Sequence, residues 1–264
     1  MTRTILFLGA ALVLATTTRA QLFLEAHGNF LLPVGGLDMN TYNNTSFGLS
    51  GTSGLYNGGR GVGGGLTLGG TLSGAVGWEA RLTYISGKES VVSYDGMSSN
   101  SENSLRSRYL RIEPALRFTS GGEGTRAYVA VGPSFVAMPR LITEEKDEYT
   151  SGAPFGGSTF TWKEEYTGGI GLGGFGAFGV LFGRGPVNFF MEVQFTAQTW
   201  APKESTWSRT ETTTNGAGSS TVSESGSTEY VTELDWNDQD KELRQRLPMS
   251  TWGMRAGLRL RLGS

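Results

Sequence analysis

The sequence predicts an all-β protein, an eight-stranded antiparallel up-and-down β-barrel that spans a membrane. Three observations predict this fold. Eight segments alternate apolar and polar or small residues with a period of two, the repeat of a strand with one apolar face. The links between these segments are alternately long and short. The chain also begins with the layout of an export signal.

The first twenty residues resemble a secretory signal peptide. Arg3 provides a short basic start, Ile5 to Ala15 is apolar, and small residues precede a cleavage point after Ala20. The apolar run is shorter than the roughly 20 residues that a transmembrane helix requires. We therefore expect residues 1–20 to be removed and residues 21–264 to form one barrel domain. A buried N-terminal helix is the alternative.

The first four predicted strands each have a distinct apolar face. In residues 22–32, leucine and phenylalanine alternate with glutamate, histidine and asparagine, and in residues 66–72 leucine faces glycine and threonine. Residues 76–84 set valine, tryptophan, leucine and tyrosine against glutamate, arginine and threonine. Residues 109–118 set leucine, isoleucine and phenylalanine against arginine and glutamate. Each pattern indicates a strand between an apolar and a polar environment.

The last four predicted strands follow the same period with different contents. Residues 127–138 are apolar on both faces, so their facing stays open. Residues 170–182 place large apolar side chains opposite glycine and alanine, and residues 187–198 set phenylalanine and valine against glutamate and glutamine. Residues 250–262 alternate tryptophan and leucine with arginine. Because an open edge in a bilayer leaves backbone groups unpaired, this last strand should pair with the first.

The links alternate in length, as membrane barrels with short periplasmic turns and long extracellular loops require. The short links are residues 73–75, 119–125 and 183–186, and the long ones are residues 33–60, 86–107, 140–167 and 201–248. The longest contains a Ser/Thr/Gly-rich stretch, Ser205 to Thr228, whose composition predicts disorder at its tip. We expect any binding function to lie in such loops, because a rigid scaffold holds them in place.

Charged side chains of both signs concentrate on the polar faces of the strands. With the single histidine they are Glu25, His27, Glu79, Arg81, Arg111, Glu113, Arg117, Glu192, Arg255, Arg259 and Arg261. An eight-stranded barrel has an interior that side chains fill, so these groups must pair with one another there. Aromatic residues near the strand ends fit membrane-interface girdles: Phe30, Trp78, Tyr84, Tyr109, Phe118, Phe182, Phe189, Trp200 and Trp252. A soluble β-sandwich or lipocalin-like barrel is the alternative fold.

Composition gives no indication of catalysis or of a cofactor. The chain has no cysteine, which excludes disulfides, cysteine metal sites and thiol catalysis, and its formal charge of −2 gives no reason to expect nucleic acid. The glycine runs lack the ending of a phosphate loop, and the acidic runs lack EF-hand spacing. A hydrolase would have to act through His27 with Glu25 nearby, and no nucleophile motif stands near them.

Two neighbouring predicted strands resemble a known family. Tyr109 to Phe118 and Tyr128 to Ser134 are similar to a Tyr-Leu-x-Ile-Pro-Leu-type strand and a following Gly-Pro strand in small outer-membrane β-barrel proteins of the OmpX and PorT-like kind. The resemblance implies a bacterial outer-membrane location, contact with outer-membrane lipid and lipopolysaccharide, and insertion by the barrel-assembly machinery. It covers about twenty residues in motif and the mature chain in topology, and it implies no single activity.

These observations favour a non-enzymatic barrel that anchors external loops for an envelope-structural or surface-interaction role. Its partner would be an extracellular or secretion-system protein. A small-solute or ion channel is the alternative, in which six arginines against four glutamates would favour anions. A hydrolase that uses His27 is the third possibility, from a different class.

Overall fold

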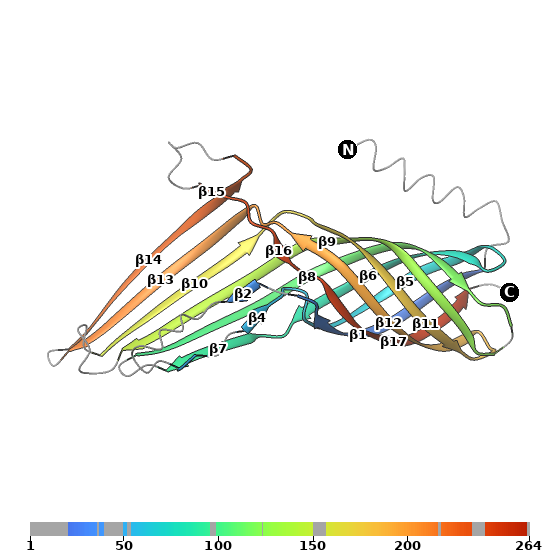
Figure 1. The fold of residues 1–264 in the computed structure, drawn as a ribbon, viewed down its shortest axis with the longest axis horizontal. Helices are drawn as coiled ribbons and strands as arrows, with labels where there is room; N and C mark the ends of the chain where they lie inside the picture. The colour runs from blue at the N-terminus through green and yellow to red at the C-terminus, as the bar shows by residue number, and fades with distance from the viewer. Residues whose placement is uncertain are drawn as a thin grey trace.

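The computed structural model describes residues 21–35, 37–39, 50–51, 54–95, 99–122, 124–149, 157–215, 218–233 and 241–262. The predicted signal peptide, residues 1–20, lies outside the described residues. The described part is all-β and consists of strands joined by turns and short links (Figure 1). Within it there is no helix with the length and apolar character needed to cross a membrane.

Eight antiparallel strands pair side by side in a closed ring. In order they are β1 (Leu22–Pro33), β5 (Gly61–Ser73), β6 (Val76–Gly87), β8 (Ser99–Thr119), β9 (Arg126–Tyr149), β11 (Gly171–Phe182), β12 (Val187–Trp200) and β17 (Thr251–Leu262). The last strand, β17, pairs with β1 along its whole length, with Glu25 opposite Arg259. The predicted pairing of the first and last strands is therefore confirmed.

The strands alternate between a buried inner face and an exposed outer face. In β12 this alternation is unbroken from Val187 to Trp200, and the outward side chains as far as Phe195 are all apolar. On the outer surface of the ring exposed apolar residues recur on every strand, so the predicted faces are largely confirmed. Tyr109 and Trp200 are corrections, because both lie buried on the inner face and not in an outer girdle.

The facing of residues 127–138, which the sequence left open, is resolved in β9. Tyr128 and Ser134 are buried inside the ring, whereas Val129 and Val131 are exposed outside. The β8–β9 pairing shifts register between Arg108 and Leu110, opposite Met138, which has a positive φ of 49°. This bulge reverses the alternation, so that beyond it odd-numbered residues of β9 take the inner face.

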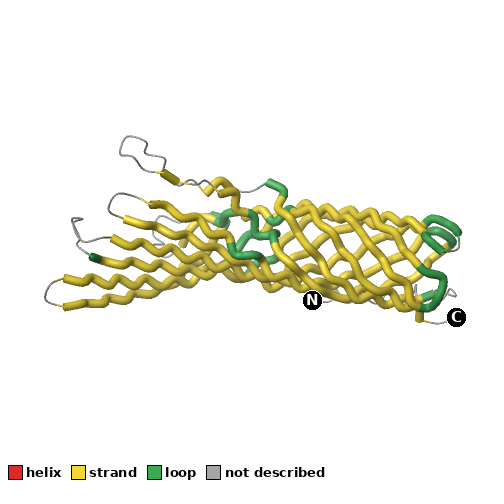
Figure 2. Tube along the Cα trace, turned by 90° about the horizontal axis from the view of Figure 1, so that it is seen from below, coloured by secondary structure: helices red, strands yellow, loops and turns green. Residues whose placement is uncertain are grey.

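Beyond the ring, β8 and β9 continue outward, and further strands pair beside them in the same sheet; we call this part the extended sheet (Figure 2). Its further strands are β3 (Ser50–Gly51), β7 (Ser90–Asp95), β10 (Ser158–Thr167), β13 (Glu204–Asn215), β14 (Gly218–Val231) and β15 (Lys241–Leu243). A separate pair, β2 (Leu37–Met39) and β4 (Gly54–Tyr56), and the short β16 (Leu247–Pro248), which pairs with β12, complete the fold.

Within the described residues, the predicted loops 86–107, 140–167 and 201–248 are thus largely strand, whereas loop 33–60 contains the end of β1 and the short strands β2, β3 and β4. Ser205 to Thr228 contains most of a hairpin of β13 and β14. Residues 216–217 at its tip, where the sequence predicts disorder, lie outside the described residues. The acidic run 144–148 lies within β9, paired with β10 on one side and β8 on the other. These segments lack an apolar face, but the backbone pairing that starts in the ring continues outward, and threonine suits extended backbone.

Candidate functional site

The interior of the ring holds nearly all the charged residues that the sequence assigned to it. All four predicted glutamates, His27 and five of the six arginines are buried there. Glu25 and Arg111 are 0% exposed. Arg261 differs, since it is half-buried and lies beside a cavity at one end of the ring, where it has no ion-pair partner among the described residues. It is on the predicted face but outside the paired network.

Six of these side chains form a closed cycle of alternating charge, which we call the cyclic network. In order around the cycle they are Glu25, Arg255, Glu192, Arg81, Glu79 and Arg117. A separate pair, Arg111 Nε and Glu113 Oε1, is 3.0 Å apart. Arg259 is an additional cation that donates to Glu25, with 2.7 Å between its Nε and Glu25 Oε1. Because the cycle holds three charges of each sign, it is electrically neutral.

One link of the cyclic network crosses the interior from side to side. Arg81 on β6 donates from both terminal nitrogens to Glu192 on β12, at 2.8 and 2.9 Å. These two strands lie on opposite sides of the eight-strand ring, four positions apart. Tyr128 also donates its hydroxyl to Glu192, at 3.0 Å. Since Arg81 is 1% and Glu192 2% exposed, a water molecule has almost no contact with either, and the interior is filled at this level.

Aromatic rings flank the buried guanidinium groups. The pairs, with the distance from guanidinium carbon to ring centroid, are Arg117–Tyr128 at 3.4 Å, Arg259–Phe23 at 3.7 Å, Arg81–Phe175 at 4.8 Å and Arg255–Phe190 at 4.9 Å. Such contacts stabilise a cation that has been removed from water. These contacts were not predicted from the sequence, although the aromatic residues share the inner-face register of the arginines.

A polar layer lies next to the cyclic network. His27 Nε2 is 3.1 Å from the hydroxyl of Thr83, and no carboxylate of the described residues hydrogen-bonds to its ring. Ser134 donates to Gln198 at 2.7 Å. Glu25 and His27 lie on one face of β1, but no carboxylate of the described residues hydrogen-bonds to His27. A catalytic triad requires such a carboxylate to orient the histidine.

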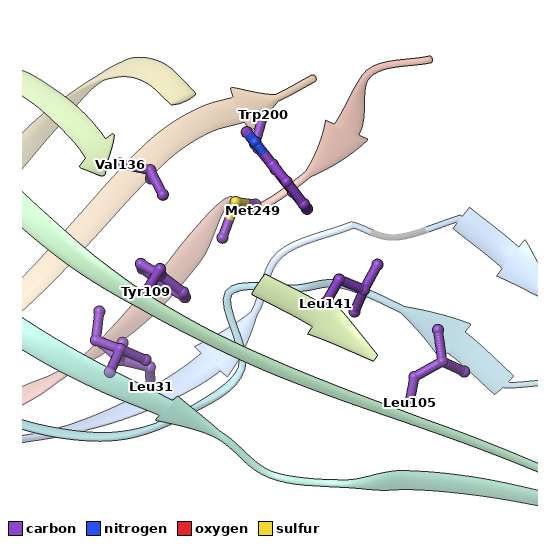
Figure 3. Packing of buried hydrophobic residues seen from close by; sticks show 8 residues of the cluster. Leu31, Leu105, Tyr109, Val136, Leu141, Trp200 and Met249 are labelled. Carbon is purple, nitrogen blue, oxygen red and sulfur yellow. The ribbon is translucent and has the colours of Figure 1, made fainter. Parts of the chain in front are cut away.

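An apolar cluster fills the end of the ring that adjoins the extended sheet (Figure 3). Its buried members are Leu31, Ile85, Leu105, Tyr109, Val136, Leu141, Trp200 and Met249. Leu141 belongs to it because the bulge at Met138 turns odd-numbered residues of β9 inward. This cluster, together with the cyclic network, blocks the interior at two levels.

A short segment, Asn57 to Gly59, lies across the same end. The Asn57 side chain donates to the carbonyls of Val34 at 3.1 Å and Ser250 at 2.8 Å, so it contacts the chain just after β1 and just before β17, which are neighbours in the ring. A Cβ on Gly59 would be 2.4 Å from the Met249 carbonyl oxygen, so only glycine fits there. No sequence pattern marks this segment, which lies in the predicted loop 33–60.

One face of the extended sheet carries aromatic side chains. Trp162 and Trp207 stack with centroids 5.0 Å apart and planes 10° apart, and Tyr166 stacks on Tyr230 at 6.0 Å. The indole of Trp207 lies over Gly226, where a Cβ would come within 2.5 Å of it. The opposite face is a ladder of Ser and Thr, for example Thr212 and Thr221 with hydroxyls 3.2 Å apart.

Acidic residues are interspersed with these aromatic side chains. Tyr166 donates its hydroxyl to Glu164 at 2.8 Å. Burial raises the pKa of Tyr166 above its ordinary value, and the hydrogen bond to Glu164 raises it further. Burial also raises the pKa of Tyr230, whose hydroxyl is 3.2 Å from that of Ser205. Both phenols therefore stay protonated to unusually high pH.

Replacement of Glu164 by glutamine is expected to lower the pKa of Tyr166, because the carboxylate that opposes ionisation is removed. A raised tyrosine pKa in the folded state contributes stability below roughly pH 10 and loses it as the pH rises further. The tyrosinate absorbance is measured as the pH is raised. The transition of Tyr166 is the one that is absent from Tyr166→Phe, and it should occur at lower pH in Glu164→Gln than in the unchanged protein. Glu165→Gln, which removes the partner of Arg140 from the opposite face, is the control and should leave the titration unchanged.

No family model and no curated protein matches the chain. Among solved structures, the fold is similar to a major outer membrane protein from Thermus thermophilus. The two share 12% sequence identity, the match covers 93% of this chain and 100% of that chain, and the TM-score is 0.36.

Proposed function

We propose that the protein is a non-enzymatic integral protein of the bacterial outer membrane. In this proposal the ring is a transmembrane barrel that holds the extended sheet outside the cell for a structural or interaction role. The observation that carries the proposal is the inverted distribution of side chains: the outer surface of the ring is apolar and the charges are inside. Soluble monomers rarely expose a continuous apolar surface of this extent, whereas a bilayer requires one.

The apolar surface has the height of a bilayer. On β17 every outward residue from Trp252 to Leu262 is apolar, with Met254, Leu258 and Leu260 all exposed. Eleven residues of strand rise about 33 Å, which becomes about 25 Å across the membrane at a tilt of about 40°. This agrees with the apolar band of outer-membrane barrels.

The arrangement of the links supports an orientation. The turns after β5, β8 and β11 lie at one end of the ring, which we call the short-turn end, and the extended sheet leaves the other end. Barrels of bacteria keep short turns in the periplasm, so the extended sheet would lie outside the cell.

The two motif strands that resemble the OmpX and PorT-like family, β8 and β9, are neighbours in the ring. Lipopolysaccharide contact and insertion by the barrel-assembly machinery are part of this proposal.

The proposed partner is an extracellular or secretion-system protein that binds the extended sheet. Stacked tryptophans beside acidic groups provide the large, partly exposed aromatic side chains that interfaces use most. Catalysis is not proposed, because the ring of His27 receives no orienting carboxylate within the described part of the chain.

Cysteine labelling tests the location and the orientation together. The chain has no cysteine, so a single introduced thiol reports one position. Ser225→Cys, exposed on the extended sheet, should react in intact cells with a maleimide that does not cross membranes. Gly185→Cys, exposed at the short-turn end, should react only after the outer membrane is permeabilised. Equal labelling of both in intact cells, or of neither, would contradict the proposal.

Conductance separates the anchor from the channel alternative. The refolded protein is expected to show no steady conductance in planar bilayers, because the cyclic network and the apolar cluster both fill the interior. Heat-modifiable migration on a gel verifies beforehand that the sample is folded. Steady, ion-selective conductance would favour the channel, with the buried arginines as its selectivity groups.

A further inference from the structure

A cavity of about 230 Å³ opens at the short-turn end of the ring. Four arginines line it, from three strands at their short-turn ends: Arg117 on β8, Arg126 on β9, and Arg259 and Arg261 on β17. Thr71, Thr119 and Ser120 also line it. No acidic side chain of the described residues lines it.

The positive charge at this cavity exceeds the negative charge near it. The cyclic network, which includes Arg117, is neutral, so Arg259 is an additional cation even though it donates to Glu25. Arg126 and Arg261 form no ion pair within the described ranges. Within the described residues, three positive charges therefore remain without a negative counterpart at this end of the ring, and a bound anion would be attracted to them.

Arg117 has donors that the protein leaves without acceptors. Its side chain is 2% exposed, and its Nη1 donates to Glu25 at 3.3 Å and to Glu79 at 3.0 Å. Its Nε and Nη2 are buried and have no hydrogen-bond partner. A buried charged donor without an acceptor is costly. Because Arg117 lines the cavity, an acceptor that reached these nitrogens from it would stabilise the folded protein.

We propose that this cavity is a binding site for a phosphate group, either free or as part of a lipid headgroup. Guanidinium groups bind phosphate oxygens through paired N–H donors, and several of them around one cavity fit a tetrahedral oxyanion with multiple acceptors. The site is independent of the proposed surface role of the extended sheet, since it lies at the opposite end of the ring. It can also be tested without a membrane.

The test uses the full mature chain, refolded in phosphate-free non-ionic micelles and titrated with inorganic phosphate by calorimetry. We expect one phosphate bound per chain, and binding that weakens as sodium chloride is added. The double variant Arg126→Gln/Arg261→Gln should bind at least tenfold more weakly. Both positions lie outside the cyclic network, and heat-modifiable migration verifies that the variant is folded. Arg184→Gln, an exposed arginine at the same end that does not line the cavity, should bind like the unchanged protein.

A second arm distinguishes the two sources of the phosphate group. Micelles are doped with phosphatidic acid or with phosphatidylcholine, and native mass spectrometry counts the lipids retained. Retention of phosphatidic acid without binding of inorganic phosphate identifies a lipid headgroup, and the reverse identifies a free oxyanion. Either result supports the proposal if the double variant loses the binding. Absence of both, or an equal loss in Arg184→Gln, would overturn it.

Discussion

Replacement of Glu25 by glutamine is expected to lower the free energy of unfolding by about 3–5 kcal/mol, the range measured when one partner of a buried ion pair is removed. Glu25 is fully buried and accepts from Arg117, Arg255 and Arg259. Glutamine keeps the size of the side chain but supplies no negative charge. Three guanidinium groups would then share an interior with too few carboxylates. Urea unfolding of the refolded protein in micelles measures the loss.

Two further variants make this result specific. Glu144→Gln removes an exposed carboxylate from β9 in the extended sheet and should change the unfolding free energy by no more than about 0.5 kcal/mol. Glu25→Gln combined with Arg259→Gln should recover part of the loss, because Glu25 is the only carboxylate among the described residues that pairs with Arg259. A loss below about 1 kcal/mol in the single variant would show that water or ions replace the missing charge, and that the interior is not dry.

The sequence was sufficient to predict the faces of the ring strands and the contents of the interior. Period-two alternation predicted the outward residues of β12 and β17, and a polar face rich in both charges predicted ion pairs. The need to pair every backbone group predicted that β17 meets β1. Each of these inferences depends on local pattern or on a constraint that applies to the whole ring.

The sequence pattern did not predict which charged residues pair with one another inside the ring. Arg81 contacts Glu192, 111 positions away, because the tilt and stagger of eight strands bring β6 and β12 together across the ring. The pattern of a single strand contains no information on that stagger. Arg261 has the inner-face register, but it lies at the end of the ring beside the arginine-lined cavity. Its register alone therefore did not show that it lies outside the ion-pair network.

The extended sheet was missed for a different reason. In β13 and β14 both faces contain polar residues, so the alternation that reveals a strand is faint. The aromatic positions Phe160, Trp162 and Tyr166 do alternate, and that period was the available signal. The bulge at Met138 has no such signal, because a methionine with positive φ gives no sequence cue of the kind that glycine gives.

Arginine substitutions at two outward positions of β12 should differ sharply in cost if the ring spans a bilayer. Val193 lies near the middle of the strand and Val187 at its short-turn end, and their exposures in the protein alone are nearly equal, 49% and 54%. In lipid vesicles Val193→Arg should lower the unfolding free energy by about 2–4 kcal/mol, because the charge lies at the membrane midplane. Val187→Arg should cost about 0–1 kcal/mol, because it reaches the interface.

The comparison is decisive because the residue type, strand, facing and exposure are matched, and only the depth differs. A soluble ring with the same fold would have water around both positions, and both substitutions would then change stability by about 0.5 kcal/mol or less. Reversible urea unfolding in vesicles, followed by tryptophan fluorescence, measures both variants under one condition. Equal losses at Val193 and Val187 would contradict a lipid-facing outer surface, and with it the anchor that the proposed function requires.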